Sequence, residues 1–308
     1  TDGEAQAALR YALWELNGFP HWFELLCQLH PAAVANVLHR EVQWELMKSA
    51  PEQNAHSVLH DLVYHAAGLH GALAPVIYDW VSSHQVVDQD CLNYCRLIMS
   101  AGDLPAADVA QLAATKIDDP STPAPLAPVW HAIRVHADPY LALSPLKRAF
   151  SLRSASKAAR FGEAFSVALL GGRRQLVKSA GRFEKPSLLK ELYMLVHRAV
   201  RVKHDLNRAN NGVYSPTLRD DAQDARERLF GLLSELPQET TYRTILELAV
   251  EHPEPRYRTY MRATALQRAT ADGDMPLWND SEVAEVAGRM TKLNGRDASS
   301  PEVRDAVY

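Results

Sequence analysis

The amino-acid sequence predicts an all-α protein. Residues that start and end helices recur at short intervals along the 308 residues, and apolar residues between them repeat at three- and four-residue steps. The single strand candidate, Val76–Val81, has neighbours that favour a helix. Pairs of expected helices recur about every 30–45 residues, the period of helical-hairpin repeats. We therefore expect an irregular solenoid of helical hairpins, similar in kind to HEAT or tetratricopeptide arrays, and a compact helical bundle is the alternative.

The N-terminal part carries recognisable helix boundaries. Thr1 and Glu4 fit a capping box, and Gly18 suits the end of a helix. Pro20 and Pro31 stand where first-turn prolines belong. The helices expected here lie at 5–17, 20–30, 31–49, 55–67, 72–84, 88–101 and 104–117.

The same pattern continues after a proline-rich loop at 118–125. Residues Ser187–Asn210 are predicted as one helix with an apolar stripe on one side and a mostly basic stripe on the other. Ser215-Pro216 interrupts the chain, and Thr217 with Asp220 caps the helix that follows. The other helices expected here lie at 126–137, 139–151, 154–170, 239–251, 256–271 and 280–293.

Charge is distributed unevenly along the chain, although the net charge is only −4. Residues 1–143 carry 6 basic and 16 acidic side chains, residues 144–208 carry 15 and 4, and residues 209–308 carry 12 and 17. A basic middle between two acidic ends is the most informative electrostatic feature of the sequence.

Composition is typical of a soluble globular protein, with 47% hydrophobic and 23% charged residues. No apolar run approaches the roughly 18 residues of a membrane span, the N-terminus does not resemble a secretory signal, and three cysteines suit a reducing compartment. We therefore predict a cytoplasmic protein without membrane contact. Its expected segments are an acidic, aromatic-rich helical array at 1–125, a basic helical segment at 126–211 and a C-terminal helical array at 212–308, joined as one continuous solenoid.

Six aromatic side chains are concentrated near the N-terminus. We expect most of them in a packed helical core, and if they were exposed they would form a docking surface. They are Tyr11, Trp14, Phe19, Trp22, Phe23 and Trp44.

No arrangement of residues predicts catalysis, a metal or a cofactor. His56 and His60 share a helix face but lack the adjacent glutamate base and third ligand of zinc hydrolases. Cys91 and Cys95 lack a second cysteine pair and are interpreted as buried apolar residues. The 171–179 segment lacks the glycine before the lysine that a phosphate-binding loop requires. We therefore expect no enzyme activity from this chain.

The basic segment is the candidate binding region. If its helices stack side by side, its cations would line one groove and neutralise phosphates, or would meet an acidic protein surface equally well. They could instead pack against the acidic flanks or face solvent. The residues expected to contact a partner are Arg173, Arg174, Lys178, Lys190, His197, Arg201, His204 and Arg208.

Two stretches, Trp14–Pro20 with the following Trp22-Phe23, and Arg198–Pro237, resemble the helical-repeat region of large bacterial NACHT-type STAND NTPases. That family is associated with anti-phage defence, and its repeats recognise the invader. The resemblance implies a sensor region of a longer chain, but the family's NTPase motifs are absent from these residues, so no catalytic residue can be transferred. The leading hypothesis is a non-catalytic module that binds a protein partner, and the alternative is a nucleic-acid-binding protein that uses residues 147–208.

Overall fold

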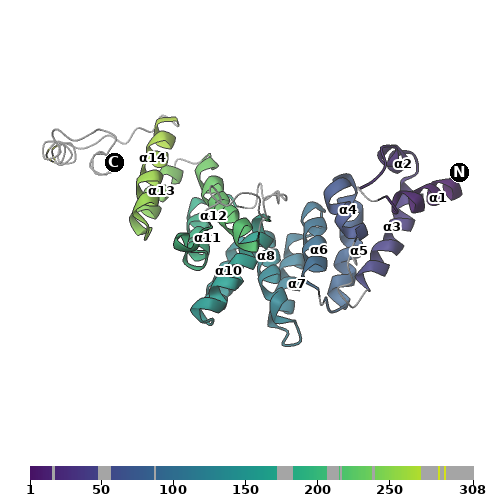
Figure 1. Ribbon diagram of the computed structural model, residues 1–308, viewed down its shortest axis with the longest axis horizontal. Coiled ribbons are helices and arrows are strands. Elements are labelled where there is room, and N and C mark those ends of the chain that lie inside the picture. Colours follow the sequence, from purple (N-terminus) through teal and green to yellow (C-terminus); the bar gives the residue numbers. More distant parts are fainter. Residues whose placement is uncertain are drawn as a thin grey trace. The chain divides into compact units, whose positions relative to one another are not determined.

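The protein, represented by a computed structural model, is described at residues 1–15, 18–47, 57–86, 88–171, 183–206, 215, 217–237 and 240–271, with 284 and 288. Within these residues it has fourteen α-helices, three short 3₁₀ helices and no strand, as Figure 1 shows. The all-α prediction is confirmed, and Val76–Val81 lies inside a helix.

The α-helices follow one another with short connections. They are α1 (Asp2–Ala12), α2 (Phe23–Leu29), α3 (Pro31–Leu46), α4 (Ser57–His65), α5 (His70–Ser83), α6 (Gln89–Ala101), α7 (Ala106–Asp118), α8 (Ala127–Ala137), α9 (Pro139–Ser151), α10 (Ala155–Leu170), α11 (Pro186–Ala199), α12 (Leu218–Glu235), α13 (Thr240–Glu251) and α14 (Pro255–Ala271). The 3₁₀ helices are η1 (Ala67–Leu69), η2 (Ala124–Leu126) and η3 (Val202–His204). The helix expected at 280–293 lies outside the described residues.

The contacts divide the chain into two compact units. The first comprises Thr1–Arg182 with Val213–Ala222, and the second comprises Phe183–Gly212 with Gln223–Tyr308. In the first unit each helix packs mainly on the next helix along the chain or the next but one, as in the pairs α3 with α5, α4 with α6, α6 with α8 and α8 with α10. In the second unit α13 packs on both α11 and α14.

Helix starts that depend on local side chains are where the sequence predicts them. Thr1 and Glu4 form the capping box, with the Glu4 backbone N–H donating to the Thr1 hydroxyl at 3.4 Å. Before α12, one carboxylate oxygen of Asp220 accepts hydrogen bonds from the backbone N–H and the hydroxyl of Thr217, both at 2.8 Å. Pro31 is in the first turn of α3. These caps satisfy amide groups that have no partner inside the helix.

Two predicted boundaries near the N-terminus are wrong. The second helix begins at Phe23 instead of Pro20, and the Phe23 amide donates to the Pro20 carbonyl at 2.9 Å. Gly18 has a positive φ of 89°, but it is not the cap of α1, because that helix ends at Ala12 with Leu13 as its C-cap. A side chain at Gly18 would also collide with the His65 ring, since its Cβ would lie 2.7 Å from that ring.

The aromatic residues near the N-terminus are divided between core and surface. Phe23 is buried and stacks on Phe19 with ring centroids 4.0 Å apart. Tyr11, Trp14 and Trp44 are exposed by 65%, 84% and 60%. The expectation of a packed core is therefore wrong for these three side chains, of which Tyr11 lies on α1, Trp14 in the turn after α1 and Trp44 on α3.

A buried carboxylate from one helix caps the next. Glu45, at the end of α3, is 1% exposed and accepts hydrogen bonds from the backbone amides of Val58 and Leu59, both at 2.9 Å. The Ser57 hydroxyl donates to the same carboxylate at 3.3 Å. Negative charge at a helix N-terminus is favourable because the free amides there carry partial positive charge. Glu45 therefore fixes the start of α4 relative to α3.

The single helix predicted over Ser187–Asn210 is shorter than expected. It ends at Ala199, because Val200 leaves the helical conformation with φ −92° and ψ 71°. The Val200 carbonyl accepts a hydrogen bond from the Arg226 guanidinium at 2.8 Å, and that guanidinium also binds Asp205, which follows η3. The break is stabilised by a side chain of α12, which local sequence periodicity does not reveal.

Candidate anion-binding pocket

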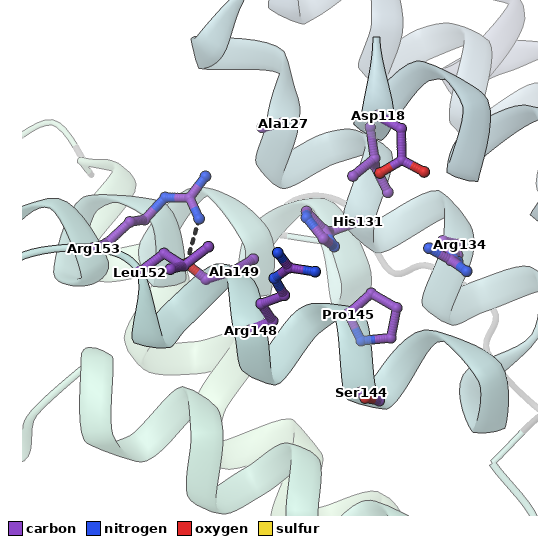
Figure 2. Close-up of a pocket in the computed structure, with 11 residues that line it drawn as sticks. Asp118, Ala127, His131, Arg134, Ser144, Pro145, Arg148, Ala149, Leu152 and Arg153 are labelled. Carbon is purple, nitrogen blue, oxygen red and sulfur yellow. Dashed lines mark hydrogen bonds between the residues drawn. The ribbon is translucent and has the colours of Figure 1, made fainter. Parts of the chain in front are cut away.

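An open pocket of about 580 Å³ lies in the first unit among α7, α8 and α9, and Figure 2 shows its lining. Its volume falls in the range of small-ligand sites. The lining residues are Ile117, Asp118, Ala127, His131, Arg134, Ser144, Pro145, Arg148, Ala149, Leu152 and Arg153.

The turn between α8 and α9 brings these residues together. Only Asp138 separates the two helices, and its carboxylate accepts hydrogen bonds from the Tyr140 and Leu141 amides at 3.1 and 3.0 Å. The α9 helix thus starts immediately after α8 ends, and the two helices pack on each other. His131 and Arg134 are three residues apart on one face of α8, while Ser144 and Arg148 are four apart on one face of α9.

His131 supplies a buried polar group to this pocket. It is 4% exposed, and its ring meets the edge of Phe161 on α10 with centroids 5.5 Å apart. Burial, together with the positive charges of Arg153 and Arg134, lowers the pKa of His131 to about 4. The imidazole is therefore neutral at pH 7, with one N–H donor and one acceptor nitrogen. It makes no hydrogen bond with any residue in the described part of the chain.

Arg153 is held in place by its own surroundings. Its guanidinium donates to the Ala149 carbonyl in the last turn of α9 and lies 4.1 Å from the centroid of the Phe161 ring. Both contacts restrict the side chain, and the aromatic face is attractive to a cation. Burial lowers the pKa of Arg153, but a guanidinium stays protonated at neutral pH. Arg153 therefore contributes a fixed positive charge to one end of the pocket.

Arg134 and Arg148 are the adaptable donors. Arg134 is half-buried and Arg148 is exposed, and neither guanidinium makes a hydrogen bond or ion pair with another residue of the described ranges. Figure 2 shows the side chains of His131 and Arg148 directed into the space between α8 and α9. The lining holds one carboxylate, the exposed Asp118 at the end of α7. Three arginines and one aspartate therefore give the lining a formal charge of +2, since the imidazole is neutral.

This combination suits the binding of an anion. Guanidinium groups present paired N–H donors that match carboxylate and phosphate oxygens, and such charge-assisted hydrogen bonds are about twice as strong as neutral ones. A neutral imidazole N–H adds a donor from the buried side. The ring nitrogens of His131 are not among the fully buried polar atoms that lack a partner in the described residues, so they remain accessible to a ligand that reaches the floor of the pocket.

The residues predicted to contact a partner are distributed differently. Lys190 donates to Glu247 and Glu251 of α13 at 2.9 and 2.7 Å, so its charge is already neutralised within the second unit. His197 is 3% exposed and packs on the His252 ring with centroids 4.2 Å apart.

Arg201 and His204 are exposed beyond the end of α11. Arg173, Arg174, Lys178 and Arg208 lie outside the described residues. Four members of the predicted set are therefore described. Arg201 and His204 are exposed to solvent, whereas Lys190 is paired with carboxylates and His197 is buried.

The pocket contains residues that the sequence reasoning did not select. Arg148 and Arg153 lie in the strongly basic stretch 144–208, but His131 and Arg134 precede that stretch, although they fall within the segment predicted at 126–211. In the sequence, His131 and Arg134 are three residues apart within one predicted helix. That helix is followed by Asp138 and then by Pro139, which begins the next helix. That spacing predicts a shared face but not a pocket.

Metal-binding and membrane features are not found in the described part of the protein. Its residues include no group of three or more His, Cys, Asp or Glu side chains placed to hold a metal ion. No described helix is both long enough and apolar enough to cross a membrane. Cys91 and Cys95 are buried, as predicted, and hydrogen bonding to Cys91 together with burial raises the pKa of Cys95.

The chain matches no family model, no curated protein and no solved structure.

Proposed function

We propose that this chain is a non-catalytic recognition module that binds a protein partner, and that the pocket around His131 receives an acidic segment of that partner. The observation that carries the proposal is the pair Arg134 and Arg148, which line the same pocket as a buried imidazole and have no carboxylate partner among the described residues. A half-buried cation such as Arg134 normally acquires a counter-ion. An acidic side chain from a partner would supply it.

The packing order of the helices supports an elongated recognition surface. In the first unit each helix packs mainly on its next or next-but-one neighbour along the chain, and this order is compatible with a solenoid of helical hairpins. We propose that arrangement, and we propose that the module is the cytoplasmic sensor region of a bacterial anti-phage receptor, as its resemblance to NACHT-type STAND NTPases implies.

Nucleic-acid binding through residues 147–208 is the second candidate. The exposed cations Lys157 and Arg160 on α10 favour it. Against it, Lys190 is already paired with two carboxylates, and the rings beside the pocket, His131 and Phe161, are buried. Proteins that bind single strands usually expose aromatic rings on which bases stack. An acidic protein segment therefore fits this pocket better than a nucleic-acid strand.

The experiment compares two labelled probes of equal net charge, a glutamate-rich peptide and a single-stranded oligonucleotide, by fluorescence anisotropy over a salt series. The pocket variant is Arg134→Gln with Arg148→Gln. The matched control is Lys157→Gln with Arg160→Gln, which removes the same charge from exposed positions of α10 outside the pocket lining.

We expect the peptide to bind the parent chain and the control variant within about twofold of each other. The pocket variant should bind it about 100-fold more weakly, because two charge-assisted hydrogen bonds of about 1.5 kcal/mol each are lost. Tighter binding of the oligonucleotide, weakened equally by both variants, would instead establish the second candidate. No binding of either probe at low salt would refute both.

A further inference from the structure

The charge of the pocket lining exceeds what a single carboxylate would balance. The lining carries a formal charge of +2 from three arginines and one aspartate. A glutamate or aspartate side chain brings one negative charge, whereas a phosphorylated side chain brings about −1.5 to −2 at pH 7. A phosphate monoester therefore matches the lining more closely.

The number and directions of the donors also favour a phosphate. Arg134 and His131 come from α8, whereas Arg148 and the Ser144 hydroxyl come from α9. Figure 2 shows Arg134 and Arg153 at opposite ends of the pocket, with His131 and Arg148 between them. A carboxylate is planar and offers two oxygens, while a phosphate monoester is tetrahedral and offers three terminal oxygens that donors can reach from different sides.

His131 lies at the buried end of the pocket, where it can donate a hydrogen bond to the ligand. It is 4% exposed and has no hydrogen-bond partner among the described residues. A neutral N–H at the floor can bind one oxygen of an anion that the arginines hold at the mouth. Arg153, fixed by the Ala149 carbonyl and the Phe161 ring, supplies charge without having to reorganise.

We propose that this pocket binds the phosphate group of a phosphorylated side chain in the partner protein. This inference rests on the proposed function, because it specifies which anionic group of a protein partner the pocket receives. The roles are distinct. Arg134 and Arg148 grip the terminal oxygens, His131 donates from the floor, and Ser144 adds a hydroxyl donor at the rim.

Replacing Asp118 tests whether the charge of the lining determines which anion the pocket prefers. It is the one carboxylate in the lining, it is exposed, and it makes no ion pair with the described arginines. Its repulsion acts on any bound anion, but about twice as strongly on a dianion as on a monoanion. Asp118→Asn should therefore tighten binding of a phosphopeptide by about threefold and of a carboxylate peptide by clearly less.

The experiment uses the full chain and three probes: acetyl-Gly-Gly-phosphoserine-Gly-Gly-amide, the same peptide with glutamate in place of phosphoserine, and inorganic phosphate. Binding is followed by calorimetry and by the ring resonances of His131 in NMR spectra. Those resonances are assigned with a His131→Gln variant, which also shows whether loss of the ring leaves the fold intact.

The expected result is that the phosphopeptide binds at least 10-fold more tightly than the glutamate peptide and shifts the His131 resonances. Arg134→Gln and Arg148→Gln should each weaken it at least 10-fold, and the control Lys157→Gln should leave it unchanged. Thermal unfolding of each variant separates loss of binding from loss of folding.

Three outcomes would contradict the inference in different ways. Equal affinity for the glutamate peptide and the phosphopeptide would overturn the phosphate assignment and leave the proposed acidic-segment recognition standing. Inorganic phosphate binding as tightly as the phosphopeptide would overturn the peptide source, since the pocket would then be a site for free phosphate. Binding of no probe, with the fold intact, would overturn the proposed function as well.

Discussion

Arg226 of α12 connects several segments of the second unit, and its replacement is expected to loosen them together. The side chain is 1% exposed. Its guanidinium donates to the Val200 carbonyl at 2.8 Å and to both carboxylate oxygens of Asp205 at 3.1 and 2.7 Å. It also lies 3.4 Å from the Tyr257 hydroxyl of α14. Burial lowers the pKa of Arg226, but the hydrogen bonds and charge of Asp205, together with the charges of Glu227 and Tyr257, raise it by more.

The change Arg226→Met keeps most of the apolar volume and removes every one of these hydrogen bonds. Asp205 then keeps its charge, and the Val200 carbonyl loses its guanidinium donor. Breaking a buried ion pair from one side costs about 3–5 kcal/mol. The Asp205 side chain is 23% exposed, so water replaces part of what is lost, and we expect about 3 kcal/mol.

Hydrogen exchange followed by mass spectrometry measures this loss of stability for each segment of the chain separately. A cost of about 3 kcal/mol should speed exchange in peptides from α11 and α12 by about 100-fold. The control is Arg198→Met, an exposed position on α11, which should change exchange by less than about threefold. Exchange in Arg226→Met that stays within threefold of the parent chain would refute the argument that this guanidinium holds the segments together.

Two further predictions concern stability. Replacing Glu45 by glutamine removes the charged cap from the Val58 and Leu59 amides, so α4 should lose about 1–2 kcal/mol of local stability in hydrogen exchange, and unchanged protection there would contradict this role. Burial lowers the pKa of His197 to about 4 and also lowers that of His252. The unfolded chain therefore binds more protons, so stability of the second unit should fall as pH decreases from about 6.5 toward 4, and urea midpoints equal at pH 7.5 and 5 would disprove it.

The sequence predicts those parts of the fold whose causes are local. The capping box at Thr1 and the cap at Thr217 follow from side chains three residues away, so both starts are readable. The end of α11 is not, because the guanidinium that stabilises the break belongs to Arg226, 26 residues further along the chain. The cap of α4 by Glu45 is missed for the same reason, since its carboxylate comes from another helix.

The candidate site can be predicted only in part from the sequence, because its residues come together through contacts between helices. Periodicity indicates which side chains share a helix face, but it does not indicate which neighbour covers that face. Lys190 and His197 lie on the predicted basic stripe, yet carboxylates of α13 neutralise the first and the His252 ring covers the second. Arg148 lies in the basic stretch 144–208, but its place in one pocket with Arg134 depends on the single-residue turn between α8 and α9.

The net charge of the chain is a poor guide to what it binds. A chain with a net charge of −4 would repel an anion if its charges acted together. At physiological salt, however, exposed charges farther apart than about 8 Å are largely screened from each other. The electrostatic free energy of an anion in the pocket is therefore set mainly by the lining. That lining has a formal charge of +2 and two arginines without carboxylate partners among the described residues. Cations already paired with carboxylates inside the protein, such as Lys190, contribute little to the attraction of an anion. This local excess of positive charge, more than the length of the basic segment, is the physical reason to expect an anionic ligand at α8 and α9.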